Sequence, residues 1–143
     1  MHNLSQAVKM AKAIAPAVAL GTGAAWTAIE VDATGFDRVC YVLYWGSQAG
    51  ATKSGVTSFQ VEEATASGGT FTAISASASS VGTGDSDDLI IIDVPVTYTS
   101  PYQKFNGTSG TEGTSACTVA AVALLYRGTR QLPIAQTIGA IVC

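Results

Sequence analysis

The amino-acid sequence predicts an all-β protein whose body is an antiparallel β-sandwich or jelly roll. Its 143 residues match the size of a single domain. Eight short stretches have the composition of β-strands, and clusters of Gly, Ser, Thr, Asn and Asp separate them. No helical periodicity lies between these stretches, which favours a fold built from sheets alone.

The N-terminal segment, residues 1–16, has a different pattern. Apolar side chains recur there at the spacing of one face of a helix, namely Leu4, Ala7, Val8, Ala11 and Ile14. Pro16 ends the pattern, because proline cannot continue a helix. We therefore expect a short amphipathic helix or an extended arm before the β-domain.

The expected strands fill residues 17–127, which we take as the β-sandwich domain. They lie at residues 17–20, 25–31, 36–45, 57–64, 70–75, 89–96, 102–107 and 117–127. Two stretches rich in Ser, Gly and Thr, residues 75–88 and 106–115, lack the apolar side chains that would order them. We expect both stretches to be surface connections.

Three of the expected strands are apolar on both faces. Side chains alternate between the two sides of a strand, and both sides are apolar or aromatic in residues 39–45, 89–96 and 117–126. A two-layer sandwich buries only one face of each strand. We therefore expect the arm, the tail or a neighbouring subunit to cover the outer faces of these strands.

The C-terminal tail, residues 128–143, has no charged residue after Arg130. Exposed apolar surface costs about 25 cal/mol per Å² relative to buried surface, so we expect this extended apolar tail, like the arm, to lie against a protein surface. The candidate partner-contact residues of the two segments are Leu4, Val8, Ile14, Leu132, Ile134, Ile138, Ile141 and Val142. The alternative is that either segment folds back over its own domain.

The composition argues against several classes of partner. The net charge is −3, and the seven Lys and Arg residues are scattered, so no basic stripe is available for nucleic acid. No stretch reaches the roughly 20 apolar residues that span a bilayer, and Lys9 and Lys12 interrupt the apolar core that a secretory signal needs. We expect a protein made and kept in a cytosol, with Cys40, Cys117 and Cys143 reduced.

The sequence offers little catalytic chemistry. The single histidine, His2, lies beside the N-terminus, where chains are usually poorly ordered, so no base can be assigned to a nucleophile. Asp85, Asp87 and Asp88 are expected to form a solvated acidic turn, with a weak cation site as the alternative. We therefore expect a protein that is not an enzyme and has no catalytic residues, no cofactor and no small-molecule substrate.

The order of short motifs along the chain resembles that of a known family. Phe36-Asp37-Arg38 opens an apolar strand, and residues 59–63 (FQVEE), 69–74 (GTFTAI) and 102–105 (YQKF) follow before the closing strand 116–125. Across residues 17–127 this order resembles small virion structural proteins of tailed bacteriophages, the head decoration or cement proteins. The resemblance implies a β-sandwich or jelly-roll body that sits on the capsid surface and bridges major capsid protein subunits, commonly as a trimer or dimer.

The resemblance implies no catalytic residues and a virion assembled in the host cytoplasm. Two other functions stay open on the residues alone. The first is a role in another part of the virion, such as the tail, the neck or the base of a head fibre. The second is a carbohydrate-binding module that uses exposed aromatic side chains, the candidates being Trp26, Trp45, Tyr41, Tyr44, Tyr98 and Tyr102.

Overall fold

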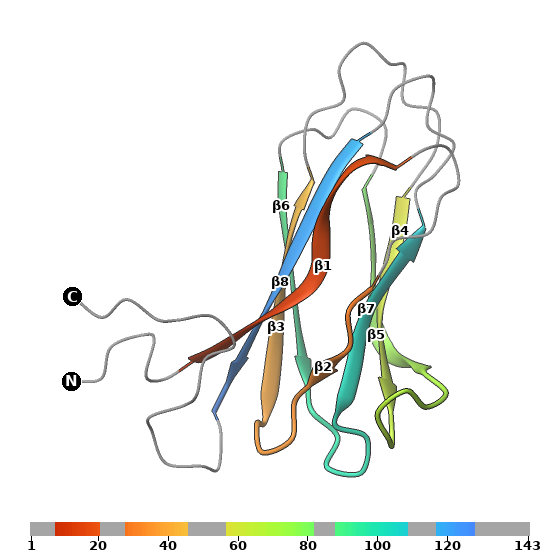
Figure 1. The fold of residues 1–143 in the computed structure, drawn as a ribbon. Helices are drawn as coiled ribbons and strands as arrows, with labels where there is room; N and C mark the ends of the chain where they lie inside the picture. The colour runs from red at the N-terminus through yellow and green to blue at the C-terminus, as the bar shows by residue number, and fades with distance from the viewer. Residues whose placement is uncertain (1–7, 21–27, 46–56, 82–87, 109–116, 128–143) are drawn as a thin grey trace, which may run out of the picture.

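The structure, a computed structural model, consists of two four-stranded antiparallel sheets packed as a β-sandwich (Figure 1). It describes residues 8–20, 28–45, 57–81, 88–108 and 117–127, and no helix occurs within them. For residues 15–20, 45, 57–58, 76–81, 88, 107–108 and 117–119 we describe the backbone alone. The predicted fold class, all-β with an antiparallel sandwich body, is confirmed.

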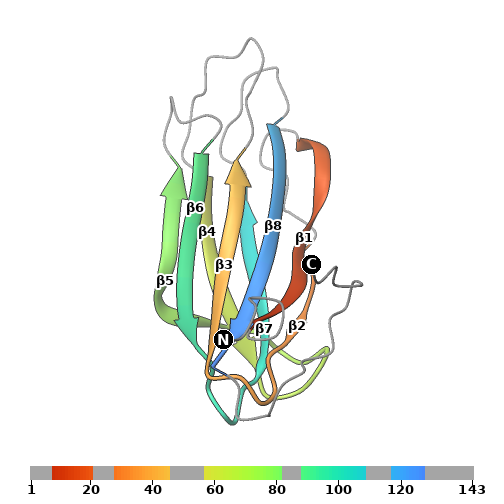
Figure 2. The same cartoon turned by 90° about the vertical axis from the view of Figure 1, so that its left-hand side faces the viewer.

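Each sheet combines strands from distant parts of the chain. The first sheet has the order β1 (Val8–Leu20), β8 (Cys117–Tyr126), β3 (Arg38–Trp45) and β6 (Asp88–Pro95). The second sheet has the order β2 (Val31–Asp32), β7 (Tyr102–Thr108), β4 (Thr57–Ala64) and β5 (Thr72–Val81). Figure 2 shows the first sheet in front, with β5 and β6 on one side of the sandwich and β1 and β2 on the other.

The core lies between the two sheets and is formed by every second residue of the central strands. Tyr41 of β3 stacks on Phe105 of β7 with ring centroids 5.3 Å apart, and Phe59 of β4 meets Phe105 edge-on at 5.6 Å. All three rings are at most 1% exposed. Aromatic pairs at these separations add to the stability that burial itself provides.

One polar side chain is fully buried among those that the structure describes. The Gln103 side chain accepts a hydrogen bond from the Tyr41 hydroxyl at 3.2 Å and donates one to the Pro95 carbonyl at 3.2 Å. These bonds join β7 of the second sheet to β3 and β6 of the first. A buried amide without such partners would be costly, so Gln103 fixes how the two sheets are aligned.

The N-terminal segment is a strand, so the helical alternative is wrong for its described part. Residues 8–20 form β1, which pairs with β8 from Val8 opposite Tyr126 to Leu20 opposite Cys117. The alanine-rich spacing suits either a helix or a strand, and the unpaired edge of β8 decides in favour of a strand. Pro16 is tolerated because β1 lies at a sheet edge and its pairing contains register shifts.

The stretch of Ser and Ala after residue 75 is a second correction. We expected a surface connection over residues 75–88, but residues 75–81 continue β5 and pair with β4 as far as Thr57 opposite Val81. Alternating small side chains fit a strand even where they supply little apolar surface. Residues 82–87, with Asp85 and Asp87, lie outside the described residues.

We predict that Tyr41→Phe lowers the free energy of unfolding by about 1–3 kcal/mol, because it leaves the buried Gln103 oxygen without a donor. Chemical denaturation measures this loss. The control is Tyr98→Phe, which removes the same hydroxyl from a side chain that is 97% exposed and should change nothing. Equal stability of Tyr41→Phe and the unmodified protein would contradict the role given to this bond.

Candidate functional site

The candidate site is the surface of the first sheet that points away from the second sheet, called the outer face below. Directly paired residues lie on the same side of a sheet, so the strand register defines this face in four rows. The rows are Leu89, Tyr44 and Ala120; Ile91, Val42, Val122 and Lys12; Asp93, Cys40, Leu124 and Met10; and Pro95, Arg38, Tyr126 and Val8.

The outer face is apolar and exposed. Leu89 and Ile91 are each 65% exposed, Met10 50%, Val122 45% and Tyr44 42%. Among the described residues the only other exposed large hydrophobic side chain is Tyr98, in the β6–β7 connection. Single exposed apolar residues are common on protein surfaces, but a contiguous group of this kind marks a site of interaction.

The corresponding surface of the second sheet is polar. Gln60 pairs with Asn106 in register, and Glu62 pairs with Lys104. The Asn106 amide donates a hydrogen bond to the Glu62 carboxylate at 3.3 Å, and the Lys104 ammonium lies 4.2 Å from the centroid of the Phe71 ring. The two sides of the sandwich therefore differ, and among the side chains that the structure describes only those of the first sheet offer an apolar surface to a partner.

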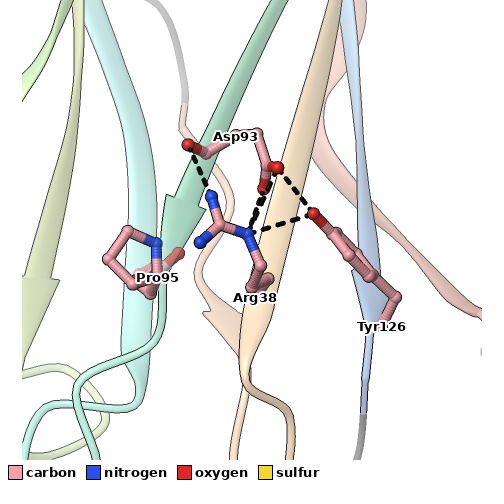
Figure 3. A network of polar contacts seen from close by, with 5 residues as sticks. Arg38, Asp93, Pro95 and Tyr126 are labelled. Carbon is pink, nitrogen blue, oxygen red and sulfur yellow. Dashed lines mark hydrogen bonds and ion pairs between the residues drawn. The ribbon is translucent and has the colours of Figure 1, made fainter.

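A polar cluster of Arg38, Asp93 and Tyr126 lies at one end of the outer face and joins β3, β6 and β8 (Figure 3). The Arg38 Nε donates to the two Asp93 carboxylate oxygens, at 3.1 and 3.2 Å, and to the Tyr126 hydroxyl at 3.1 Å. The Tyr126 hydroxyl donates to Asp93 Oδ2 at 2.6 Å. The three side chains thus satisfy one another on an open surface.

The cluster changes the acid–base behaviour of its members. Hydrogen bonding to Asp93 raises the pKa of the Arg38 guanidinium above its ordinary value, and hydrogen bonding to Asp93 also raises the pKa of the Tyr126 hydroxyl. Both groups therefore keep their protons at neutral pH. The cluster carries a fixed charge pattern of one cation and one anion at the margin of the apolar rows.

Cys40 also belongs to the outer face, between Asp93 and Leu124 in register. Its thiol is free, and burial raises its pKa, which keeps it in the unreactive thiol form. The side chain is half-buried on the outer side of β3. The side chains of Cys117 and Cys143 lie outside the described part.

The structure separates the two candidate partner-contact residues that it describes. Ile14 is 3% exposed and belongs to the core of its own domain, so it is not available to a partner. Val8 is half-buried and lies in the last row of the outer face, opposite Tyr126. Leu4, Leu132, Ile134, Ile138, Ile141 and Val142 lie outside the described residues.

The sequence did not identify the most exposed apolar residues of the outer face individually. The sequence marked β3, β6 and β8 as apolar on both sides, but it did not say which side the sandwich buries. The signal would have been the alternation along β3, since the face of Tyr41 also carries Val39 and Trp45 and is better suited to the core than the face of Arg38 and Cys40. The burial of Tyr41 places Val42 and Tyr44 outside, and the register then adds Leu89, Ile91 and Val122.

The described ranges contain neither a cluster of metal-binding side chains nor a membrane-spanning helix. Within them no group of three or more His, Cys, Asp or Glu side chains is placed to hold a metal ion. The proposed cation site of Asp85, Asp87 and Asp88 is not tested, because no side chain of the three is described. Nor does any helix in the described ranges have the length and apolar character needed to cross a membrane.

The fold is similar to that of one solved structure, the PBSX exported protein XepA. The TM-score is 0.58 at 15% sequence identity, and the match covers 100% of this chain and 45% of XepA. The chain therefore spans less than half the length of XepA, and at this identity the likeness concerns the fold alone. No protein-family model matches the chain, and no curated protein is similar to it in sequence.

We predict that Asp93→Asn lowers the pKa of Tyr126, because it removes the negative charge that holds the hydroxyl proton and leaves Arg38 in place. The raised pKa means that the contribution of Tyr126 to stability is present below its ordinary value of about 10 and is lost as pH rises through the higher folded-state pKa. An NMR titration of the tyrosine rings measures the change.

Tyr41 is the internal control for that titration. Burial in the core raises its pKa, so its ring signals should not titrate together with those of Tyr126, in the variant or in the unmodified protein. If the pKa of Tyr126 stays the same in Asp93→Asn, the carboxylate does not hold the hydroxyl as described.

Proposed function

We propose that the protein is a non-enzymatic structural component of a phage virion, and that it decorates and stabilises the capsid by docking on major capsid protein subunits through the outer face. The observation that carries this proposal is the row of exposed apolar side chains over β8, β3 and β6. A surface that must be shielded from water suits a protein whose working state is an assembly.

The size of the outer face fits a repeated contact. Four strands about 4.8 Å apart, each presenting about eight residues at a rise of about 3.4 Å, give a projected area of roughly 500 Å². A stable pairwise interface buries about 800 Å² on each partner. One outer face is smaller than that, so its attachment gains from many copies bound to the same symmetric shell.

The similarity to XepA supports the phage association. XepA is described as an exported protein of PBSX, a phage, and its structure contains a region with the fold of this chain. The family resemblance of the sequence points in the same direction. The alternative is a protein of the tail, the neck or a head fibre. Such a protein would use the same fold and would also need an apolar contact surface.

A carbohydrate-binding role has less support from the described aromatic side chains. Tyr41 lies in the core, and Tyr102 is half-buried. Tyr44 pairs with Leu89 at one end of β6, whereas Tyr98 follows the other end of that strand. The two exposed tyrosines therefore do not form a common platform for a sugar ring.

Binding to empty heads tests the proposal. We predict that Val122→Asp reduces occupancy on heads at least tenfold, because it places a charge in the middle of the buried contact. Purified heads that lack this protein are mixed with each variant and sedimented, and the bound protein is quantified. Circular dichroism establishes that the variant is folded.

The matched control is Tyr98→Asp, which adds the same charge to an apolar side chain that is exposed but lies outside the outer face. It should bind heads like the unmodified protein. Equal occupancy of heads by both variants would refute docking through the outer face. Binding to isolated tails or necks, with none to heads, would place the protein elsewhere in the virion.

A further inference from the structure

The two lateral sides of the sandwich differ in the hydrogen bonding of their main-chain groups. On one side, Ile29 donates a main-chain hydrogen bond to the Ala13 carbonyl at 2.8 Å, and Ile14 forms a β-bridge with Ala28. These contacts connect β1 of the first sheet to the segment that enters β2 of the second. On the other side, β6 and β5 end their sheets, and no strand of the described chain pairs with their outer edges (Figure 2).

Three of the four edge strands have features that discourage pairing with another chain. The pairing of β1 shifts register three times, and the strand contains Pro16. The strand β2 has only two residues. The pairing of β5 with β4 shifts register between Gln60 and Glu62. Bulges, proline and short length are the usual means by which natural sheets protect their edges.

The fourth edge strand, β6, has none of these features. It has eight residues in unbroken register with β3, its sequence DLIIIDVP contains no Lys or Arg, and its one proline is the last residue. Its single ionic contact ties Asp93 to Arg38 of the same sheet, which leaves the strand without an unpaired charge at that position. An extended apolar edge of this kind is a template for a further strand.

The exposure of the β6 side chains shows that one flank is missing. In the second row of the outer face, Val42 of β3 is half-buried because Ile91 and Val122 flank it on both sides. Ile91 has a neighbour on one side only and is 65% exposed, as is Leu89. A strand added beside β6 would cover Leu89 and Ile91, in the same way that the neighbouring strands β6 and β8 cover Val42.

We propose that the missing strand is β6 of a second copy of this chain, paired antiparallel about a twofold axis. Among the described strands, the protected edges β1, β2 and β5 offer no comparable strand, so β6 itself is the complementary edge that the described part of the chain provides. A twofold contact uses the same surface on both copies, and antiparallel pairing then satisfies the free main-chain groups of both strands reciprocally. The result is one continuous eight-stranded sheet.

The side-chain pattern of β6 suits this symmetric pairing. Residues directly opposite one another must point to the same side of the sheet. A twofold axis meets this condition when one residue of β6 lies opposite the same residue of the second copy. With the axis at Ile90, Leu89 lies opposite Ile91 of the partner subunit on the outer side. The apolar residues of both copies then meet in the middle of the extended outer face.

The dimer goes beyond the proposed function and would form whether or not the outer face docks on a shell. It also brings two outer faces into one plane, so their combined projected area is on the order of 1,000 Å², above the roughly 800 Å² per partner of a stable interface. The small area of a single outer face is thus a second argument for a second copy.

Sedimentation velocity of the full chain with two matched double variants tests this pairing. Leu89→Lys with Ile91→Lys places like charges opposite one another at the axis, which disfavours cross-strand pairing. We expect the unmodified protein to be a dimer, and we expect the dissociation constant of the dimer to be at least tenfold higher for this variant. Met10→Lys with Val122→Lys adds the same charge to the same outer face away from β6, and it should remain a dimer.

Hydrogen exchange gives a second measurement. Amides of residues 88–95 should gain protection as the protein concentration rises, whereas amides of β1 and β5 should not. A monomeric unmodified protein, an oligomer other than a dimer, or a dimer that the Met10 and Val122 substitutions dissociate would overturn the proposal. Loss of head binding by Val122→Asp together with a monomeric unmodified protein would overturn the dimer alone. Unchanged head binding by Val122→Asp together with an intact dimer would overturn the docking alone.

Discussion

The contact of Tyr41 with Phe105 and Gln103 is the constraint on which the rest of the structure depends. It is the place where a ring stack and a buried hydrogen bond join the two sheets at the same residue. Side chains alternate along a strand, so burying Tyr41 turns Cys40, Val42 and Tyr44 away from the core. The register of β6 and β8 with β3 then determines which of their side chains also point away from the core. The outer face is therefore a direct consequence of how the core is packed.

The sequence predicts β3, β4, β6, β7 and β8 well because these strands are rich in β-branched or aromatic residues, or alternate clearly between apolar and polar ones. Residues 57–64 match β4 at both ends. The errors at β1 and β5 share one cause, since runs of Ala and Ser are compatible with helix, loop or strand and only the neighbouring strand decides. Most of the site was out of reach because it requires the pairing of strands from opposite ends of the described chain, as in Val8 and Tyr126.

The polar cluster gives the outer face a direction. The apolar rows lie between the Leu89 end and the end that holds Arg38, Asp93 and Tyr126. Because these three groups satisfy one another, a partner that covers them need not neutralise an isolated charge, which would be costly. Lys12 is the other charged residue of the face and lies on β1, away from β6. The β6 half of the face is thus the half with the least obstacle to burial.

The two proposed contacts use different directions of the same sheet. Docking on a shell uses the outer face, perpendicular to the sheet plane, whereas pairing of β6 with a second copy extends the sheet within that plane. Neither contact obstructs the other, so both can be made by one molecule at once. This property suits a protein that stabilises a lattice, because such a protein contacts both the shell beneath it and a neighbouring copy beside it. In the proposed dimer, lateral growth would stop at two copies, because β1 is connected to the segment that enters β2, the pairing of β5 contains a register shift, and the twofold contact uses β6 of both chains.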